Sequence, residues 1–106
     1  MSHQFTAEGW PNNIGKRGRL VHPDKHITFF TIIDEIRKPQ SNYPPKVIYL
    51  QLIQFDDERR ELRLCYYIKG KIGRTKGKWV FGQFATLLPS LDFKEIITEA
   101  KLREWL

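Results

Sequence analysis

Cysteine is almost absent from this chain, and its scarcity excludes two classes of protein. Cys65 is the only cysteine among the 106 residues, so no disulfide can form within the chain. A lone thiol also leaves a structural zinc site without its set of cysteine and histidine ligands. The chain is therefore neither a disulfide-stapled scaffold nor a zinc finger, and we expect it in a reducing compartment, the cytoplasm.

Long hydrophobic runs are absent as well. No apolar stretch approaches the ~20 residues that a membrane-spanning helix needs. The first residues, MSHQFTAEGWPNN, lack the basic start and apolar run of a secretory signal. We therefore expect no membrane association.

Motifs for nucleophilic and metal chemistry are missing too. The sequence has no GxSxG elbow, and Cys65 stands beside Tyr66 in an expected strand, where a thiol acts as a small apolar filler. His22 and His26 have a helical ligand spacing, but Pro23 lies between them. We predict no catalytic residue, no metal ion and no cofactor, and we expect the protein not to be an enzyme.

Carboxylates offer one remaining route to chemistry. A metal-dependent nuclease needs acids that converge on Mg²⁺, and Asp34, Glu35 and Lys46 are candidates for such a site. Adjacent strand residues point to opposite faces, however, and Asp56 and Asp57 stand where a hairpin turn favours polar residues. A nuclease is thus the third-ranked alternative, and it predicts Asp34 or Glu35 next to Asp56 or Asp57.

What the chain does have is enough apolar sequence for one core. Hydrophobic residues make up 41% of it, and 106 residues are typical of a single domain, which we assign to residues 1–106. Glycine and proline interrupt residues 1–24 at short intervals, which predicts mostly loop. Phe5 and Trp10 are expected to pin this segment to the core.

The predicted fold is α+β: a small, mainly antiparallel sheet of three to four strands packed against one C-terminal helix, residues 92–105. Residues 27–36 are rich in β-branched and aromatic side chains, which favours a strand, and the helical alternative would place Phe29, Ile33 and Ile36 on one face. Two apolar runs, 47–55 and 62–69, flank a short polar turn, as in a hairpin. Residues 78–84 predict a short fourth strand.

Prolines and caps set the expected boundaries. Pro39, Pro44 and Pro45 predict a long turn after the first strand, because proline has no N–H to donate to a ladder. Asp92 or Ser90 is expected to cap the first turn of the helix.

Alternation over residues 62–68 predicts which side chains of that strand face the core. Because side chains alternate along a strand, Leu62, Leu64 and Tyr66 are expected to face inward and Tyr67 outward.

The charge is strongly basic and uneven. The chain has 18 Lys and Arg against 12 Asp and Glu, a formal charge of +6, which is a first sign of a polyanion binder. Residues 69–78, KGKIGRTKGK, hold bases and no acid, with aromatic residues on either side. Cations neutralise phosphates and exposed rings stack on bases. This connector is the main candidate for binding DNA or RNA.

A second basic group, GKRGR at residues 15–19, resembles a phosphate-contacting arm in composition but lacks the spacing of a Walker loop. We therefore expect a small basic nucleic-acid-binding protein, in which the two groups form one positive face with Tyr67 or Trp79 exposed. The candidate binding residues are Lys16, Arg17, Arg19, Tyr67, Lys69, Lys71, Arg74, Lys76, Lys78 and Trp79.

The alternative is a protein-interaction module or homodimer. Residues 47–55, VIYLQLIQF, are apolar on both faces, so something must cover the second face of this strand. The N-terminal segment with Trp10 is one candidate, and a second copy pairing through the sheet is the other.

Overall fold

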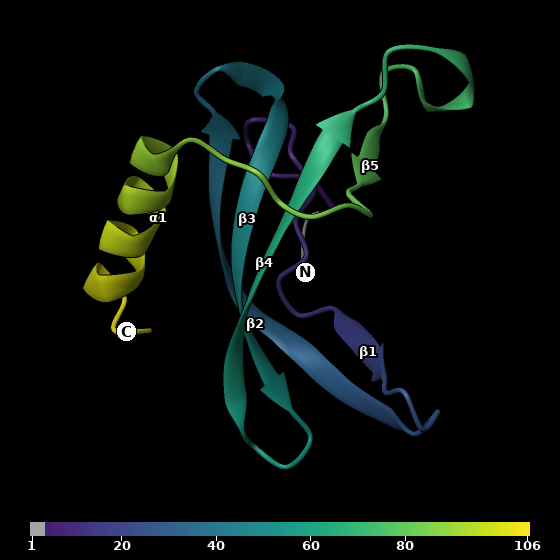
Figure 1. The fold of residues 1–106 in the computed structure, drawn as a ribbon, viewed down its shortest axis with the longest axis vertical. Helices are drawn as coiled ribbons and strands as arrows, with labels where there is room; N and C mark the ends of the chain where they lie inside the picture. The colour runs from purple at the N-terminus through teal and green to yellow at the C-terminus, as the bar shows by residue number, and fades with distance from the viewer. Residues whose placement is uncertain (1–3) are drawn as a thin grey trace.

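The protein folds as one curled antiparallel sheet with a single α-helix at its side. The computed structural model describes residues 4–106, and in it five strands follow one another in the order β1-β2-β3-β4-β5 (Figure 1). The α+β prediction is confirmed, with one more strand than expected. The elements are β1 Arg17–Val21, β2 Ile27–Gln40, β3 Tyr43–Phe55, β4 Arg60–Lys69, the 3₁₀ turn η1 Gly73–Thr75, β5 Trp79–Phe81 and α1 Ser90–Leu102.

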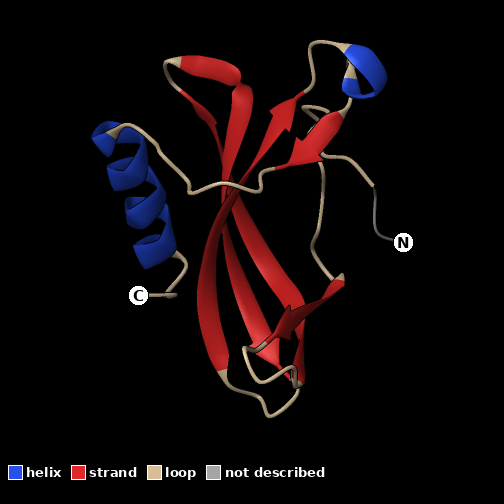
Figure 2. Ribbon diagram, turned by 45° about the vertical axis from the view of Figure 1, so that its right-hand side comes forward, coloured by secondary structure: helices blue, strands red, loops and turns tan. Residues whose placement is uncertain are grey.

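The long central strands are those predicted from the apolar runs. β2 contains the predicted segment 27–36, and β3 and β4 form the predicted hairpin, with Leu50 opposite Leu64. All neighbouring strands are antiparallel, and the sheet twists and curls into a half-barrel (Figure 2). This curl gives the sheet a concave face, on which the N-terminal segment lies, and a second face that carries the helix.

The long proline-rich turn was a wrong prediction. β2 runs to Gln40 and β3 begins at Tyr43, so only two residues separate the strands. Gln40 pairs with Tyr43 and Pro39 with Val47, which leaves a bulge holding Pro44 and Pro45 opposite no β2 residue. Prolines are tolerated at such bulges because no ladder hydrogen bond is needed from them.

Residues 1–24 were predicted to be mostly loop, and Arg17–Val21 at the end of this stretch form an edge strand, β1, that the prediction did not include. Gly18 pairs with Phe30 of β2, and a Cβ at this position would lie 2.4 Å from the Phe30 ring. The glycine therefore makes room for a core aromatic ring and is not a chain breaker here.

The fourth predicted strand, 78–84, is shorter than expected. β5 has only three paired residues, and the chain then leaves the sheet at Gly82, whose N–H donates to the Tyr66 carbonyl. A Cβ on Gly82 would lie 2.1 Å from the Tyr66 ring. Close packing on that ring ends the strand early.

Helix α1 starts two residues before the predicted first residue, 92, and ends three residues before the predicted last residue, 105. Neither proposed cap acts as one: the helix has no side-chain cap, and Asp92 is buried and accepts a 2.8 Å hydrogen bond from the Ser41 N–H. The carboxylate thus ties the helix to the β2–β3 turn. In the described residues 4–106 no helix is long and apolar enough to cross a membrane.

The helix covers the upper half of one sheet face. Ile96 and Ala100 pack with a buried cluster on β2, β3 and β4, and Trp105 folds back against it. Tyr66 faces this cluster as predicted, whereas Leu62 and Leu64 lie beyond the helix and are 36% and 39% exposed. The prediction that Leu62 and Leu64 face the core was wrong, because alternation determines which face a side chain occupies and not how far the helix covers that face.

Candidate nucleic-acid interface

A pocket of about 600 Å³ opens where the N-terminal segment meets β4 and β5. Lys16, Lys69 and Lys78 line it, and none of the described residues in its wall is acidic. The remaining wall is largely aromatic and glycine-rich, with members from three separate stretches of sequence. The lining residues are Gln4, Phe5, Gly9, Pro11, Asn13, Lys16, Tyr67, Lys69, Gly77, Lys78 and Trp79.

Strand register places the aromatic and basic residues on one face. Lys69 pairs with Trp79 and Tyr67 with Phe81, so these cross-strand pairs share the concave side of the sheet. The Lys69 ammonium lies 5.6 Å from the centre of a Trp79 ring, and the Tyr67 and Phe81 rings meet edge to face at 5.3 Å. The pocket therefore has a floor of half-buried rings with a cation at its edge.

Hydrogen bonds anchor the N-terminal segment across this face. The Trp79 indole donates to the Gly9 carbonyl at 3.0 Å, and the Tyr49 hydroxyl donates to the Pro11 carbonyl at 2.6 Å. The Tyr67 hydroxyl donates to Asn13 at 3.1 Å. Burial raises the pKa of both the Tyr49 and Tyr67 phenols, so both remain donors at neutral pH. Trp10 packs against a buried cluster of Val47, Tyr49 and Cys65, which confirms that this segment covers the second face of β3.

A buried carboxylate holds the segment from below. The side chain of Glu35 has no exposed surface and accepts two 3.0 Å hydrogen bonds from Asn13, one from its backbone N–H and one from its amide. Gln51 donates to the same carboxylate at 2.6 Å, and Arg37 pairs with it at 3.1 Å. These hydrogen bonds compensate for the cost of burying the carboxylate charge. It fixes the position of Asn13, a pocket residue that the sequence prediction missed.

Only one residue of the second basic group reaches the pocket. Lys16 lines it, but Arg17 turns away to Asp56 at 2.9 Å, a contact that raises the pKa of the guanidinium and lowers that of the carboxyl. Arg19 is exposed on the edge strand β1. Of the second basic group, Lys16 alone lies with Lys69 and Lys78 among the lining residues, and Arg17 and Arg19 do not.

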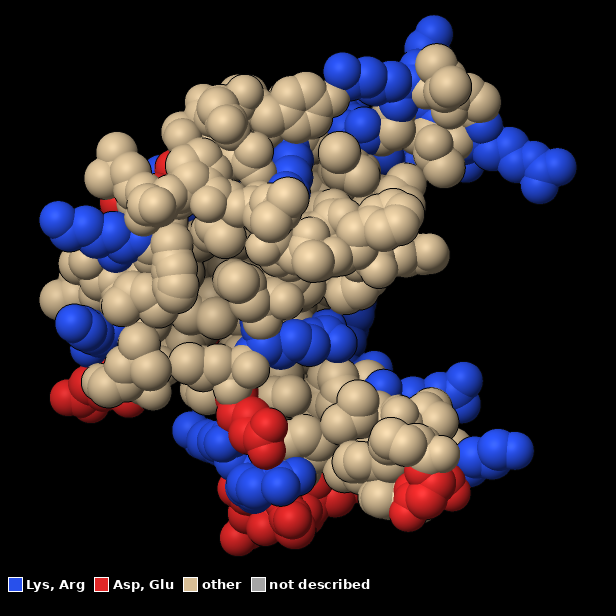
Figure 3. Space-filling model, in the orientation of Figure 1, with Lys and Arg blue, Asp and Glu red and all other residues tan. Residues whose placement is uncertain are grey.

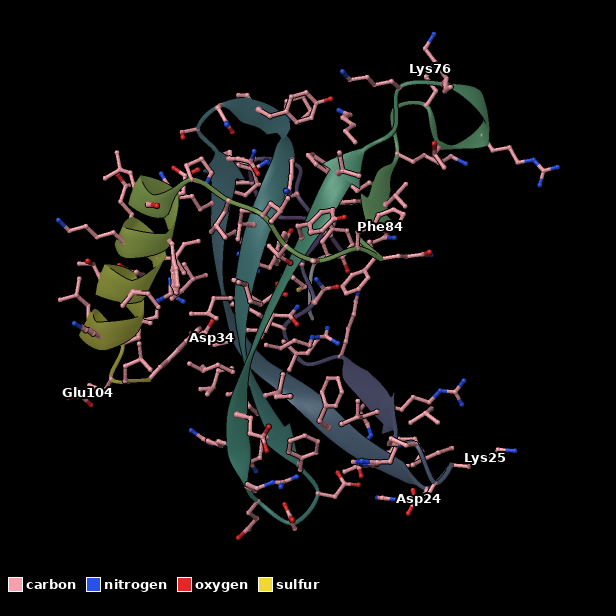
Figure 4. All side chains as sticks on the ribbon, in the orientation of Figure 1. Asp24, Lys25, Asp34, Lys76, Phe84 and Glu104 are labelled. Atoms are coloured by element: carbon pink, nitrogen blue, oxygen red, sulfur yellow. The ribbon has the colours of Figure 1, made fainter. Side chains whose placement is uncertain are left out.

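The connector carries the remaining candidates away from the pocket. Lys71 lies over the Tyr43 ring at 4.8 Å, and Arg74 and Lys76 are exposed at the connector's tip, where Lys76 points away from the sheet (Figure 4). No ion pair within residues 4–106 involves a base of residues 69–78. Blue side chains dominate this lobe at the upper right of Figure 3, while acidic ones gather at the opposite end of the molecule.

The carboxylates named for a nuclease do not come together. Asp34 pairs with Arg103 at the end of the helix, Glu35 lies in the buried network, and Asp56 pairs with Arg17. Across the described part of the chain, no three His, Cys, Asp or Glu side chains form a group that could hold a metal ion.

His22 and His26 form a stacked pair at the tip of the β1–β2 hairpin. The rings of His22 and His26 stack at 3.8 Å and are nearly parallel. Each ring bonds to a different side chain, His22 to Thr28 and His26 to Asp24.

Comparison with protein-family models, with curated proteins and with solved structures finds no match to this chain.

Proposed function

We propose that the protein is a non-enzymatic nucleic-acid-binding domain. The observation that carries the proposal is the pocket at the N-terminal segment, in which Lys16, Lys69 and Lys78 surround half-buried aromatic rings without an acid among its described lining residues. Cations at such a wall neutralise phosphate charge and release counterions. Rings beside them offer stacking surface that tolerates any base.

The connector extends this charge beyond the pocket. Lys71, Arg74 and Lys76 have no acidic partner among the described residues, so they carry full charge toward an incoming polyanion. Exposed cations of this kind speed association, and their attraction for a polyanion falls sharply as the salt concentration rises. In this proposal the pocket contacts the nucleic acid, and the connector attracts it electrostatically.

Titration with labelled single- and double-stranded DNA and RNA tests this function. Binding at about 50 mM salt should weaken linearly in log[salt], and replacing Lys16, Lys69 and Lys78 by alanine should remove about 2 from the slope of log K for a single strand. A second triple variant, K71A/R74A/K76A, should lower the affinity and the slope similarly. The matched control R60A/K94A/K101A makes the same change in net charge on other surfaces and should lose less.

Two outcomes would overturn the proposal. The first is an absence of binding to all four nucleic acids at low salt. The second is an equal loss in the control and pocket triples, because net charge alone would then explain the affinity.

A homodimer is the second candidate, favoured by the uncovered part of the helix face. Leu62 and Leu64 are exposed there, beside a hollow of about 390 Å³ that contains both Arg60 and Glu61. An apolar patch with both signs of charge can be complementary to itself across a two-fold axis.

Light scattering tests the dimer directly. The expected result is the mass of two chains at micromolar concentration, reduced to one chain by L62K/L64K with an unchanged far-UV spectrum. A monomer at every concentration would remove this candidate.

A further inference from the structure

Arg63 occupies a distinctive place on the concave face, outside the pocket. Its guanidinium lies 5.1 Å from the centre of the Phe30 ring and 5.5 Å from the centre of the Phe81 ring. Phe30 belongs to β2 and Phe81 to β5, which are not neighbours in the sheet. The curl of the half-barrel therefore brings the two strands to either side of one arginine.

Arg63 is also held in place. Its Nε–H donates to Gln51 at 2.7 Å, and Gln51 is itself fixed by its bond to the buried Glu35. Packing and hydrogen bonding therefore hold the side chain before any ligand arrives, which lowers the entropy that binding must overcome.

Its charge is not neutralised by a neighbour. The ion pairs of residues 4–106 do not include Arg63, although the side chain is partly buried. Rings lie near the guanidinium and Gln51 accepts its Nε–H, so the edge formed by the two Nη groups is the part left for a ligand. That edge is a fork of N–H donors, which matches two oxygens of a phosphate.

Phe81 connects Arg63 to the pocket. Phe81 is 41% exposed and touches Tyr67, which lines the pocket. Along β4 the side chains of Lys69, Tyr67 and Arg63 point to the same face, with the buried Cys65 between the last two, and six residues of strand span ~20 Å. The space-filling view shows the molecule hollowed at its right edge, between the lobe of β5 and the connector and the lobe of β1 (Figure 3).

We propose that Arg63 and Phe81 form a second nucleic-acid contact, which receives a single strand running along β4 from the lysine pocket. Arg63 binds a phosphate through its fork, and the exposed Phe81 ring stacks on an unpaired base. A stacking ring has no free base face to meet within an intact duplex, so the ligand is single-stranded. This inference rests on the proposed function and adds the ligand class and the path.

The chain offers a matched control for Arg63. Arg60 lies on the same strand and donates its Nε–H to Gln54 at 2.8 Å, just as Arg63 donates to Gln51. Arg60 lines the hollow on the helix face instead of the concave face. The two arginines thus share strand, charge and partner type and differ in the face they occupy.

The experiment measures the affinity of each variant for a labelled single strand of about 12 nucleotides at about 50 mM and about 200 mM salt. R63A should weaken binding about tenfold, the loss of one charged hydrogen-bonded contact, and reduce the salt slope by about 0.7. R60A should stay within about twofold of the parent because it faces elsewhere.

Two further variants separate a binding role from a structural one. R63K keeps the charge but not the fork, and should weaken binding about threefold with an unchanged salt slope. F81L keeps apolar bulk without a ring, and should weaken binding about fivefold, again with an unchanged slope. If R63A does not fold, these two decide the question.

The outcomes distinguish this inference from the function beneath it. Equal affinities for R63A, R63K, F81L and the parent, with loss of binding in the K16A/K69A/K78A variant, would overturn the Arg63 contact and leave the proposed function standing. Preference for a duplex of the same sequence would overturn the single-stranded ligand. No binding by the parent would overturn both.

Discussion

The two faces of β3 are covered in different ways. Under the helix, Ile48 and Leu50 meet Ile96 and Ala100 in a cluster made mainly of aliphatic side chains. On the opposite face, Val47 and Tyr49 lie under an N-terminal segment that is tied down by hydrogen bonds to Glu35. The helix is thus held over β3 mainly by apolar packing, with hydrogen bonds at its ends, whereas buried hydrogen bonds anchor the N-terminal segment on the other face.

The difference explains where the pocket lies. Apolar packing fills space, because its stability depends on area removed from water, and the hollow on the helix face lies at the margin of the cluster, beside Leu62 and Trp105. Hydrogen bonds instead hold the N-terminal segment at fixed points, such as Asn13 and the Gly9 carbonyl, and allow a gap beside them. A binding site is therefore expected on the face whose cover is polar.

The largest effect is expected from Glu35→Ala. Removing the carboxylate leaves Arg37 and the Asn13 amide without their partner, which should lower the free energy of unfolding by about 3–5 kcal/mol. Denaturant unfolding measures this loss. Asp34→Ala is the control, since its half-exposed pair with Arg103 should contribute less than about 1 kcal/mol. Equal losses in the two variants would contradict the directional role of Glu35.

A similar loss of stability with a different consequence is expected from Ile48→Ala. This fully buried side chain lies in the helix-side cluster, and its truncation should cost about 2–4 kcal/mol. Leu62→Ala, on the same face but exposed, should cost less. Nucleic-acid affinity of the folded Ile48→Ala protein should match the parent, whereas Glu35→Ala should weaken it. A binding defect in Ile48→Ala would blur the distinction between the faces.

Alkaline pH should act on the polar-covered face. Burial raises the pKa of the Cys65 thiol from 9.0 to about 11. The folded protein then keeps a proton that the unfolded chain loses, so this stability is complete below pH ~9 and is lost as the pH rises to ~11, about 2–3 kcal/mol in all. Unfolding measured from pH 8 to 11 tests this. Cys65→Ala should show a flatter profile, and an unchanged slope would refute the assignment.

The smallest effect is expected from Tyr67→Phe. It deletes the hydroxyl that donates to Asn13 and should cost about 0.5–1.5 kcal/mol. The ring that lines the pocket remains, so affinity for a single strand should change less than about threefold. Tyr67→Leu removes the ring as well and should weaken binding further. A larger binding loss in the phenylalanine variant than in the leucine variant would exclude stacking by this ring.

The local sequence pattern predicted those elements whose structure depends on their own side chains. Two apolar runs around a short polar turn were enough for the β3–β4 hairpin, and two-residue alternation was enough for the opposite orientations of Tyr66 and Tyr67. The exceptions depend on partners distant in sequence. Gly18 belongs to a strand because the Phe30 ring needs its space, and Asp92 serves a turn 51 residues away instead of its own helix end.

The candidate site was predicted in part for the same reason. Composition singled out Lys69, Lys78 and Trp79, which do share a pocket, and Lys16 joins them through the fold of the N-terminal segment. Nothing local distinguishes Arg17, which pairs with Asp56, from Lys16, which does not. Arg63 was passed over because its two aromatic neighbours come from strands that meet only when the sheet curls.

The connector has one further consequence for how this domain can be altered. Its base is closed by the Gly70 N–H to the Lys78 carbonyl and the Gly77 N–H to the Gly70 carbonyl, each at 2.9 Å. Because the sheet ends before this closure, the loop beyond it behaves as a cassette. Residues 71–76 can be exchanged for segments of other length or charge at little cost to the scaffold, since loop closure entropy grows slowly with length. Changes confined to one short stretch of sequence can thereby alter the charge of this surface while the scaffold stays intact.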